Sequence, residues 1–344
     1  MTKTDAAPSL AGSASHQTGH RIRLPAETGA VIALAILVAM LGWLSPSFLE
    51  PANLLSMLGQ AALPGLLAIG MVFVLAARQI DLSAGAAFHL SATFAALLMV
   101  DGMDPWPAAL AGVAAGACLG LINGLLAITL RLPALVVTLG TWWMIQGLSL
   151  VAGKGQAVVP PKADGNFFAG LSGKAFVIVP VVAIVFVALA LVMHVVLHRT
   201  RFGYRVQAVG SNPQAADYAG IPTGTVRLLT LMLMGAMAGL AGVIHVGAHG
   251  TIAPGDGSTF TLLAIAAAII GGTALSGGRG SVVGAAIGML ILQLILSAMA
   301  LFGVDPVWNS FATGALLVLA LAVDRLGRWW RNRDGARTGD NPVG

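Results

Sequence analysis

Long apolar stretches separated by short polar segments make up most of the chain, and this pattern predicts helices that cross a membrane. Each stretch is continuous rather than alternating, which argues against an outer-membrane barrel. The ~30 Å core of a bilayer needs about 20 helical residues, so we expect an all-α, polytopic transmembrane helical bundle of about ten spans. The stretches cover residues 29–46, 54–77, 84–100, 107–130, 133–153, 175–198, 227–248, 262–276, 281–301 and 308–323.

The composition excludes a soluble enzyme. The 344-residue chain is 57% hydrophobic and 9% charged, whereas soluble domains carry about 25% charged residues. So few charges cannot cover a surface that faces water. The chain also contains 44 glycines, which suit a packed bundle because small residues let transmembrane helices approach closely.

The distribution of positive charge orients the predicted spans. With ten spans and the N-terminus inside, 15 of the 18 Lys and Arg residues fall on the inner side and 3 on the outer side. Cytoplasmic loops carry an excess of Lys and Arg, so we expect both termini in the cytoplasm. The chain then divides into a polar cytoplasmic tail (1–27), a transmembrane domain (28–324) and a basic cytoplasmic tail (325–344).

Glycine interrupts one of the predicted spans. The stretch 262–276 is short for a ~30 Å core, contains Gly271 and Gly272, and ends at Ser276. Irregular backbone at membrane depth is tolerated only where protein or a water-filled cavity surrounds it, and short, Gly-interrupted segments in transporters point toward the translocation path. We therefore expect a discontinuous or re-entrant helix here. A similar break separates the second and third stretches at residues 78–85.

Few polar side chains lie in or beside the apolar stretches, and these are candidates for the path of a solute. Asp81 is the acidic residue closest to the membrane core. It either lines the path, because intramembrane carboxylates are commonly functional, or caps the third span at the inner interface. The other candidates carry neutral hydrogen-bonding groups, which also commonly join helices, and are Ser83, Asn123, Thr138 and Thr141. The intramembrane histidines lack a metal-binding spacing, so we expect no metal site.

The predicted inner loop at residues 199–226 contains the signal of a short helix. Asn212 is a typical N-cap, Pro213 suits the first helical position and Gly220 suits a C-terminal stop. A helix this short is unstable alone in water. The segment is therefore either a docking element for a cytoplasmic partner or an ordinary solvated loop.

Several chemical signatures do not occur in the sequence. There is no G-x-x-x-x-G-K-[ST] phosphate loop, so the chain cannot hydrolyse ATP alone, and we expect it to bind no cofactor. No nucleophile elbow or zinc signature occurs, which disfavours a membrane-embedded enzyme. An ion-coupled secondary transporter is the main alternative to an ATP-driven one, although such transporters commonly have carboxylates in several spans and only Asp81 lies near one here.

Four motifs occur in order within residues 29–324. They are Ile80-Asp81-Leu82-Ser83-Ala84-Gly85; Arg201-Phe202-Gly203 with Ala208-Val209-Gly210-Ser211-Asn212, Ala215-Ala216 and Gly220-Ile221; Ala264-Ile265-Ala266-Ala267 with Ile270-Gly271-Gly272-Thr273 and Leu275-Ser276-Gly277-Gly278-Arg279-Gly280-Ser281; and a weaker pair, Asn123-Gly124 and Val137-Thr138-Leu139-Gly140-Thr141. With these motifs the chain resembles the permease subunits of bacterial ABC importers for ribose, xylose, rhamnose and autoinducer-2. It departs from them at Arg78-Gln79, where many members have two glycines, and at Gln214, where glutamate is common.

The resemblance implies a transmembrane permease subunit of an ATP-driven importer for a sugar or sugar-like solute in the bacterial plasma (inner) membrane. It implies three protein partners: a periplasmic sugar-binding protein, a second permease subunit and a cytoplasmic ABC ATPase that hydrolyses the ATP. The candidate substrate-pathway residues are Asp81, Ser83, Asn123, Thr138, Thr141, Gly271, Gly272 and Ser276. The implied ATPase-coupling residues are Arg201, Phe202, Gly203, Gly210, Asn212, Gln214, Ala215, Ala216 and Gly220.

Overall fold

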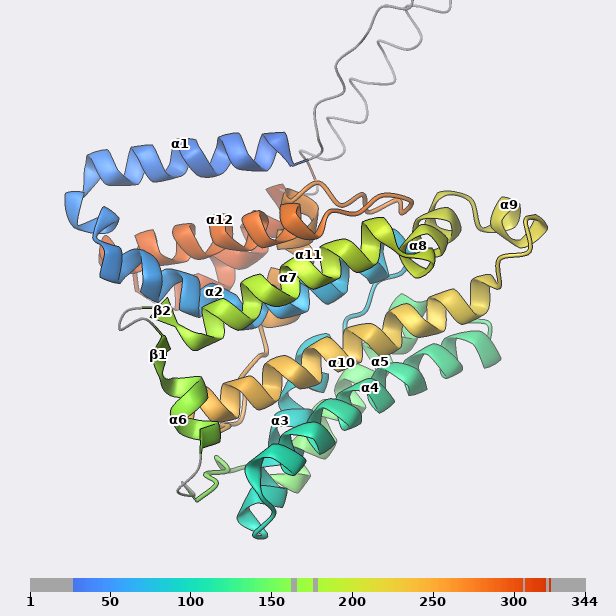
Figure 1. Cartoon of the computed structure of the whole chain (residues 1–344), viewed down its shortest axis with the longest axis horizontal. Coiled ribbons are helices and arrows are strands. Elements are labelled where there is room, and N and C mark those ends of the chain that lie inside the picture. The colour runs from blue at the N-terminus through green and yellow to red at the C-terminus, as the bar shows by residue number, and fades with distance from the viewer. Residues whose placement is uncertain (1–26, 162–165, 176–178, 306, 320–321, 323–344) are drawn as a thin grey trace, which may run out of the picture.

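A computed structural model describes residues 27–161, 166–175, 179–305, 307–319 and 322 (Figure 1). Apart from Glu27, the two tails predicted at 1–27 and 325–344 lie outside these residues. Within them the protein is a bundle of helices, most of which run side by side along the long axis.

Each of the ten predicted apolar stretches contains one apolar helix. In the part of the chain that the structure describes, six helices are long and apolar enough to cross a membrane, and four more are apolar but shorter. The all-α membrane fold is therefore confirmed, whereas the count of ten spans stays a prediction. The helices are α1 (Thr28–Leu44), α2 (Pro51–Ala76), α3 (Ala84–Val100), α4 (Pro105–Thr129), α5 (Ala134–Ala152), α7 (Val181–Arg199), α10 (Thr223–His249), α11 (Phe260–Ile270), α12 (Val282–Leu301) and the helix Trp308–Leu319.

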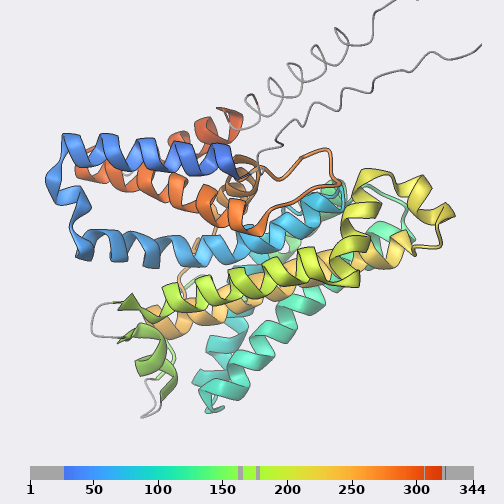
Figure 2. The same ribbon diagram turned by 45° about the horizontal axis from the view of Figure 1, so that its top comes forward.

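Short elements lie at the two ends of this bundle. A 3₁₀-helix, η1 (Pro46–Leu49), joins α1 to α2. The helix α6 (Asn166–Ser172) and the antiparallel strands β1 (Lys174–Ala175) and β2 (Val179–Pro180) lie at the end that the charge pattern places outside. Two further helices, α8 (Arg201–Ser211) and α9 (Pro213–Tyr218), project at the opposite end (Figure 2).

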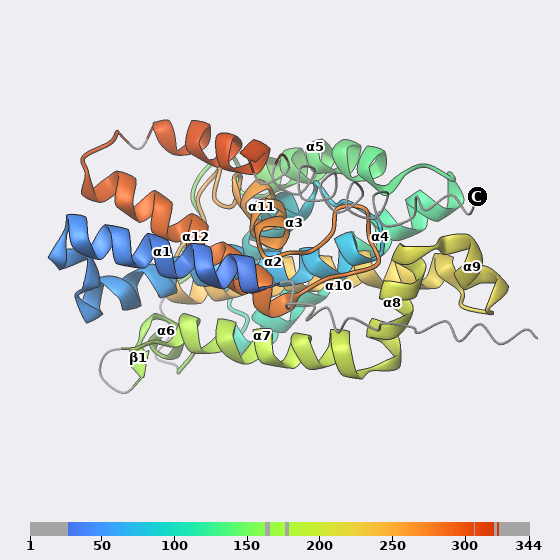
Figure 3. The ribbon, with the colours of Figure 1, turned by 90° about the horizontal axis from the view of Figure 1, so that it is seen from above.

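The helix α2 lies near the centre of the bundle when the molecule is seen from above (Figure 3). Its residues are buried without interruption from Ala61 to Ala77. A helix that is apolar on all sides is stable only where protein or lipid surrounds it completely. The neighbours α7, α10, α11 and α12 cover α2, so its apolar surface is satisfied by protein.

Glycines allow α4 to approach α10, the helix it packs against most extensively. Gly112, Gly116, Gly120 and Gly124 recur at every fourth position and therefore lie along one face of α4. A Cβ atom on Gly116 would overlap the carbonyl of Gly235 in α10. This contact agrees with the expectation that the glycines serve close helix packing.

The predicted interruption in the stretch 262–276 is present. The helix α11 has 11 residues, about 16 Å at ~1.5 Å per residue, or about half of a bilayer core. Residues 271–281 contain no helix, and α12 starts anew at Val282. The hydroxyl of Ser281 caps α12 by accepting a hydrogen bond from the Gly284 N–H at 2.9 Å.

The first turn of α3, which follows the first break, meets the first turn of α11, which precedes the second break. The Gly85 N–H donates to the Thr261 Oγ1 at 2.8 Å. Next to this contact the rings of Phe88 and Phe260 pack edge to face, with centroids 5.1 Å apart. The chain therefore places two interrupted segments against each other at the centre of the protein.

Candidate functional site

The loop between α2 and α3 folds around the carboxylate of Asp81. This side chain is 1% exposed. Its Oδ1 accepts hydrogen bonds from the Ser83 N–H at 2.8 Å and from the Ser83 Oγ at 2.6 Å. A carboxylate that accepts from the N–H two residues on forms an Asx turn, and this turn ends the irregular segment where α3 begins.

Neighbouring helices hold the same loop by neutral polar groups. Asn123 on α4 donates from its Nδ2 to the Ser83 Oγ at 2.8 Å. The Leu82 N–H donates to the Thr138 Oγ1 of α5 at 3.0 Å, and the Thr141 Oγ1 donates to the Thr138 carbonyl at 3.4 Å. The structure thus brings together five predicted pathway residues, here called the break cluster: Asp81, Ser83, Asn123, Thr138 and Thr141.

The break cluster is almost completely buried, with every member at most 8% exposed. None of the five lines one of the cavities described below. The Asn123 Oδ1 is buried and has no hydrogen-bond partner among the described residues. The cluster therefore positions the broken segment, and contact of these residues with a solute stays a prediction.

The other predicted pathway residues lie in the loop after α11. The backbone of Gly271 packs so closely against Gly284 that a Cβ atom on either residue would overlap the other's carbonyl. Gly272 has a φ of +89°, a conformation that favours glycine, and Ser276 is exposed. Among the described residues, no hydrogen bond joins these three to the break cluster.

The predicted short helix in the inner loop is present as α9. The Asn212 Oδ1 accepts from the Ala215 N–H at 3.0 Å, which is the expected N-cap contact. Gly220 has a φ of +77° and its N–H bonds to the Asp217 carbonyl at 2.9 Å, so it follows the helix as expected. The sequence did not predict α8, which begins after the N-cap Thr200.

The predicted coupling residues divide into an exposed and a buried set. Exposed residues are Arg201, Asn212, Gln214, Ala215 and Gly220. Phe202 is partly buried and stacks on Phe73 of α2 with ring centroids 6.2 Å apart. Gly203, Gly210 and Ala216 are buried within this chain, so they shape the element from inside and offer no surface to a partner.

Gly210 joins the inner helices to both breaks. A Cβ atom at this position would overlap the Ala76 carbonyl at the end of α2 and would lie 2.5 Å from the Gly278 nitrogen in the loop after α11. The Gly278 N–H donates to that same Ala76 carbonyl at 3.0 Å. A movement of α8 would therefore reach the end of α2, where the first irregular segment begins, and the loop after α11.

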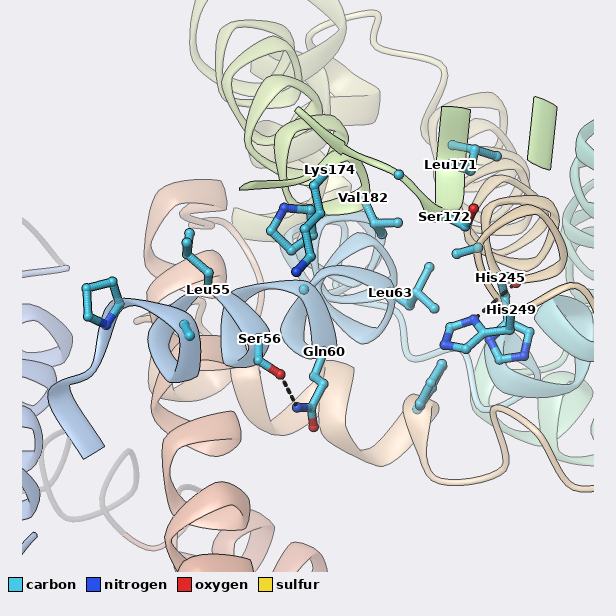
Figure 4. Close-up of a pocket in the computed structure, with 17 residues that line it drawn as sticks. Leu55, Ser56, Gln60, Leu63, Leu171, Ser172, Lys174, Val182, His245 and His249 are labelled. Carbon is cyan, nitrogen blue, oxygen red and sulfur yellow. Dashed lines mark hydrogen bonds between the residues drawn. The ribbon is translucent and has the colours of Figure 1, made fainter. Parts of the chain in front are cut away.

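Two cavities lie at the opposite end of the bundle. The larger, of about 800 Å³, is the outer basic cavity, and its charged or titratable lining residues are Lys174, His245 and His249. Figure 4 shows it with Ser56 and Gln60 side by side on α2 and the two histidines nearby. His245 also lies 3.2 Å from the Asp256 carboxylate in the loop before α11.

The second cavity, of about 550 Å³, lies between α2, α11, α12 and the helix Trp308–Leu319. It contains Gln60 and Gln293, which the sequence analysis missed. Neither residue is acidic, and neither lies at a glycine break. A neutral amide in the middle of an apolar stretch, as in Leu292-Gln293-Leu294, was the signal that could have identified them.

Comparison with known proteins gives one family and several relatives. The family described as "Branched-chain amino acid transport system / permease component" matches residues 53–321. The ribose import permease protein RbsC of Bacillus subtilis (strain 168) is 38% identical over 300 residues, 87% of this chain and 92% of that protein. The D-allose transport system permease protein AlsC of Escherichia coli (strain K12) is 36% identical over 301 residues, 87% and 91% respectively. The autoinducer 2 import system permease protein LsrC of Salmonella typhi is 33% identical over 298 residues, 87% of this chain and 85% of that protein. No solved structure matches the chain.

Proposed function

The chain belongs to the family described as the permease component of the branched-chain amino acid transport system, and we propose that it moves an uncharged sugar or sugar-like solute through the bacterial plasma membrane while a separate ATPase supplies the energy. That it is a permease subunit of an ABC import system follows from the family and from its sugar-permease relatives. These relatives give the ion-coupled alternative no support.

The observation that carries the energy-coupling part of the proposal is the contact of α8 with the end of α2 and with the loop after α11. The exposed surface of α9 is free to meet a cytoplasmic protein, with Tyr218 93% exposed. Behind it, Gly210 packs on Ala76 and Gly278. Closure of an ATPase dimer would displace α9, and the displacement would pass through α8 to the segments that lead to α3 and α12.

To transport a solute by way of this contact, the protein has to alternate between two arrangements. A ligand or partner shifts an equilibrium only by its differential affinity for the two states, and interrupted helices and shifted loops are common ways to switch. We propose that ATP binding to the partner favours one arrangement of the broken segments and that hydrolysis releases it. A periplasmic binding protein and a second permease subunit complete the assembly.

Co-purification with the cognate ATPase tests the proposal. We expect the wild-type complex in liposomes to hydrolyse ATP faster when the sugar-loaded binding protein is present. Tyr218→Glu places a charge where the partner would bury it and should abolish ATPase association while insertion is unchanged. The control Trp308→Glu, at an exposed aromatic on the predicted outer edge, should leave association intact. If Tyr218→Glu retained its ATPase at wild-type levels, α9 would not be the docking element.

A second variant separates docking from transmission. Gly210→Ala forces the α8 backbone away from Ala76, so we expect the ATPase to remain bound while stimulation by the loaded binding protein is lost. Gly224→Ala is the matched control, because among the described residues its Cβ would meet the Ile128 Cδ1 alone within 4 Å, at 3.9 Å. Equal stimulation of both variants would refute the transmission route.

A further inference from the structure

We propose that the cavity between α2, α11, α12 and the helix Trp308–Leu319 binds the transported solute and selects an uncharged polyhydroxylated molecule through amide and hydroxyl groups alone. We call it the neutral cavity. This inference rests on the proposed function, to which it adds a binding site and a chemical basis for selection.

The lining of the neutral cavity combines polar groups with an absence of charge. Its volume is about 550 Å³, within the ~300–1,000 Å³ range usual for small-molecule sites. Among the described residues that line it, none is charged. Seven of them are polar, and these are Asn53, Gln60, Thr259, Gln293, Ser297, Asn309 and Thr313. By contrast, arginines line a cavity of about 710 Å³ at the other end, and they are Arg78, Arg131 and Arg227.

At the centre of the lining, Gln293 and Gln60 join α12 to α2 by their amides. Gln293 is 8% exposed. Its Nε2 donates to the Gln60 Oε1 at 3.1 Å and to the Ser297 Oγ at 3.3 Å. A neutral polar group at this depth is costly unless it is hydrogen-bonded, so the pair fixes where the two helices present their polar atoms.

The pair keeps unused hydrogen-bonding capacity. A primary amide has two N–H donors and an oxygen that accepts twice. The Gln293 Oε1 makes no hydrogen bond to any described residue, and Gln60 uses one N–H, toward the Ser56 Oγ at 3.2 Å. The unused acceptor of one amide and the unused donor of its hydrogen-bonded partner together suit a sugar hydroxyl, which both donates and accepts.

The absence of charge decides the class of solute. An anion or cation moved into this cavity would lose its hydration without an opposite charge to replace it. A sugar instead exchanges water for amide and hydroxyl partners, and neutral hydrogen bonds are weak enough for it to leave again. Phe260 and Leu263 supply an apolar wall for its C–H face. Gln60 and Phe260 also line the outer basic cavity, so the two cavities adjoin.

Thiol protection tests binding at this place. Cys118 is the single cysteine of the chain, so Cys118→Ser gives a background without thiols. In the assembled complex, Ser297→Cys should react with a small thiol reagent, and high concentrations of D-ribose or D-allose should slow that reaction several-fold. D-gluconate, which carries a carboxylate, should not. The matched control Ser172→Cys, which lines the outer basic cavity, should react at the same rate with and without sugar.

Substitution of the amides tests their contribution to transport. Gln293→Leu and Gln60→Leu should each lower ATP-driven uptake of the sugar about tenfold, the effect of losing one to two hydrogen bonds, while leucine inserts into the membrane more readily than glutamine. Gln156→Leu, in an exposed outer loop, should transport at the wild-type rate.

The outcomes distinguish this inference from the proposed function. If the complex transports either sugar with ATP, but neither sugar protects Ser297→Cys and Gln293→Leu transports normally, the neutral cavity is not the binding site and the proposed function stands. Equal protection by D-gluconate would overturn selection by neutral groups. If the wild-type chain neither retains an ATPase nor takes up either sugar, the proposed function itself fails.

Discussion

At the scale of single residues, Thr138 joins the loop before α3 to the helix α5. Its Oγ1 accepts from the Leu82 N–H at 3.0 Å and lies 3.4 Å from the Ile80 carbonyl. The side chain is fully buried. One hydroxyl therefore satisfies backbone groups on both sides of Asp81, in a segment that has no helix to satisfy them.

Thr138→Val should destabilise the protein by about 1–3 kcal/mol, because it keeps the shape of the side chain but leaves a buried N–H without a partner. We expect a lower midpoint of thermal unfolding in detergent. Thr138→Ser is the control, since it retains the hydroxyl, and its midpoint of thermal unfolding should lie much closer to that of the wild type. Equal midpoints for Thr138→Val and Thr138→Ser would show that the hydroxyl does not stabilise the loop.

The sequence identified the members of the break cluster but not their contacts. Asp81 and Ser83 share a motif, whereas Asn123 lies 40 residues away from Ser83 and Thr138 lies 56 residues away from Leu82. Their proximity depends on how α3, α4 and α5 pack, and no spacing in the sequence encodes it. The same holds for Gln60 and Gln293, which are 233 residues apart.

At the scale of elements, local chemistry predicted some helices and missed another. An N-cap, a proline and a glycine were enough to predict α9, and length and glycines were enough to predict the break after α11. The helix α8 was missed because its residues Arg201–Ser211 contain no long apolar stretch. It is stabilised by tertiary packing, with Val206 and Val209 buried against the bundle.

The glycine face of α4 gives a prediction at this scale. Gly120→Leu would overlap the Leu231 carbonyl of α10, and overpacking of this kind costs about 1–3 kcal/mol or more. The Cβ of Gly140→Leu on α5 would meet no described residue within 4 Å. Both changes gain the same helix propensity, so the difference between them isolates the packing.

We expect Gly120→Leu to aggregate on size-exclusion chromatography or to unfold at a temperature well below that of the wild type in a thermal scan. Gly140→Leu should elute like the wild type and unfold at the same temperature. The opposite order, or equal behaviour of the two variants, would mean that α4 and α10 can separate without loss of the fold.

At the scale of the whole molecule, the outer and inner ends differ in chemistry. The end predicted to face outside holds α6, the two short strands, the outer basic cavity and the neutral cavity, whereas α8, α9 and the arginine-lined cavity lie at the other end. A solute-binding region at one end and a surface for an energy-supplying partner at the other are what an importer needs.

Labelling of one position on each side of α7 tests the orientation of the whole chain, because α7 is the one predicted span between residues 156 and 218. Both positions are exposed, and the 15-to-3 distribution of Lys and Arg places Gln156 outside and Tyr218 inside. In the Cys118→Ser background, Gln156→Cys should react with a membrane-impermeant thiol reagent on cells whose outer membrane alone has been permeabilised. Tyr218→Cys should react only after the inner membrane is also opened. A missed or additional span before α7 would exchange the two results, and the loss of α7 would make them equal. Labelling of this single pair therefore checks both the orientation and the number of spans on which the assignment of α9 to the cytoplasm depends.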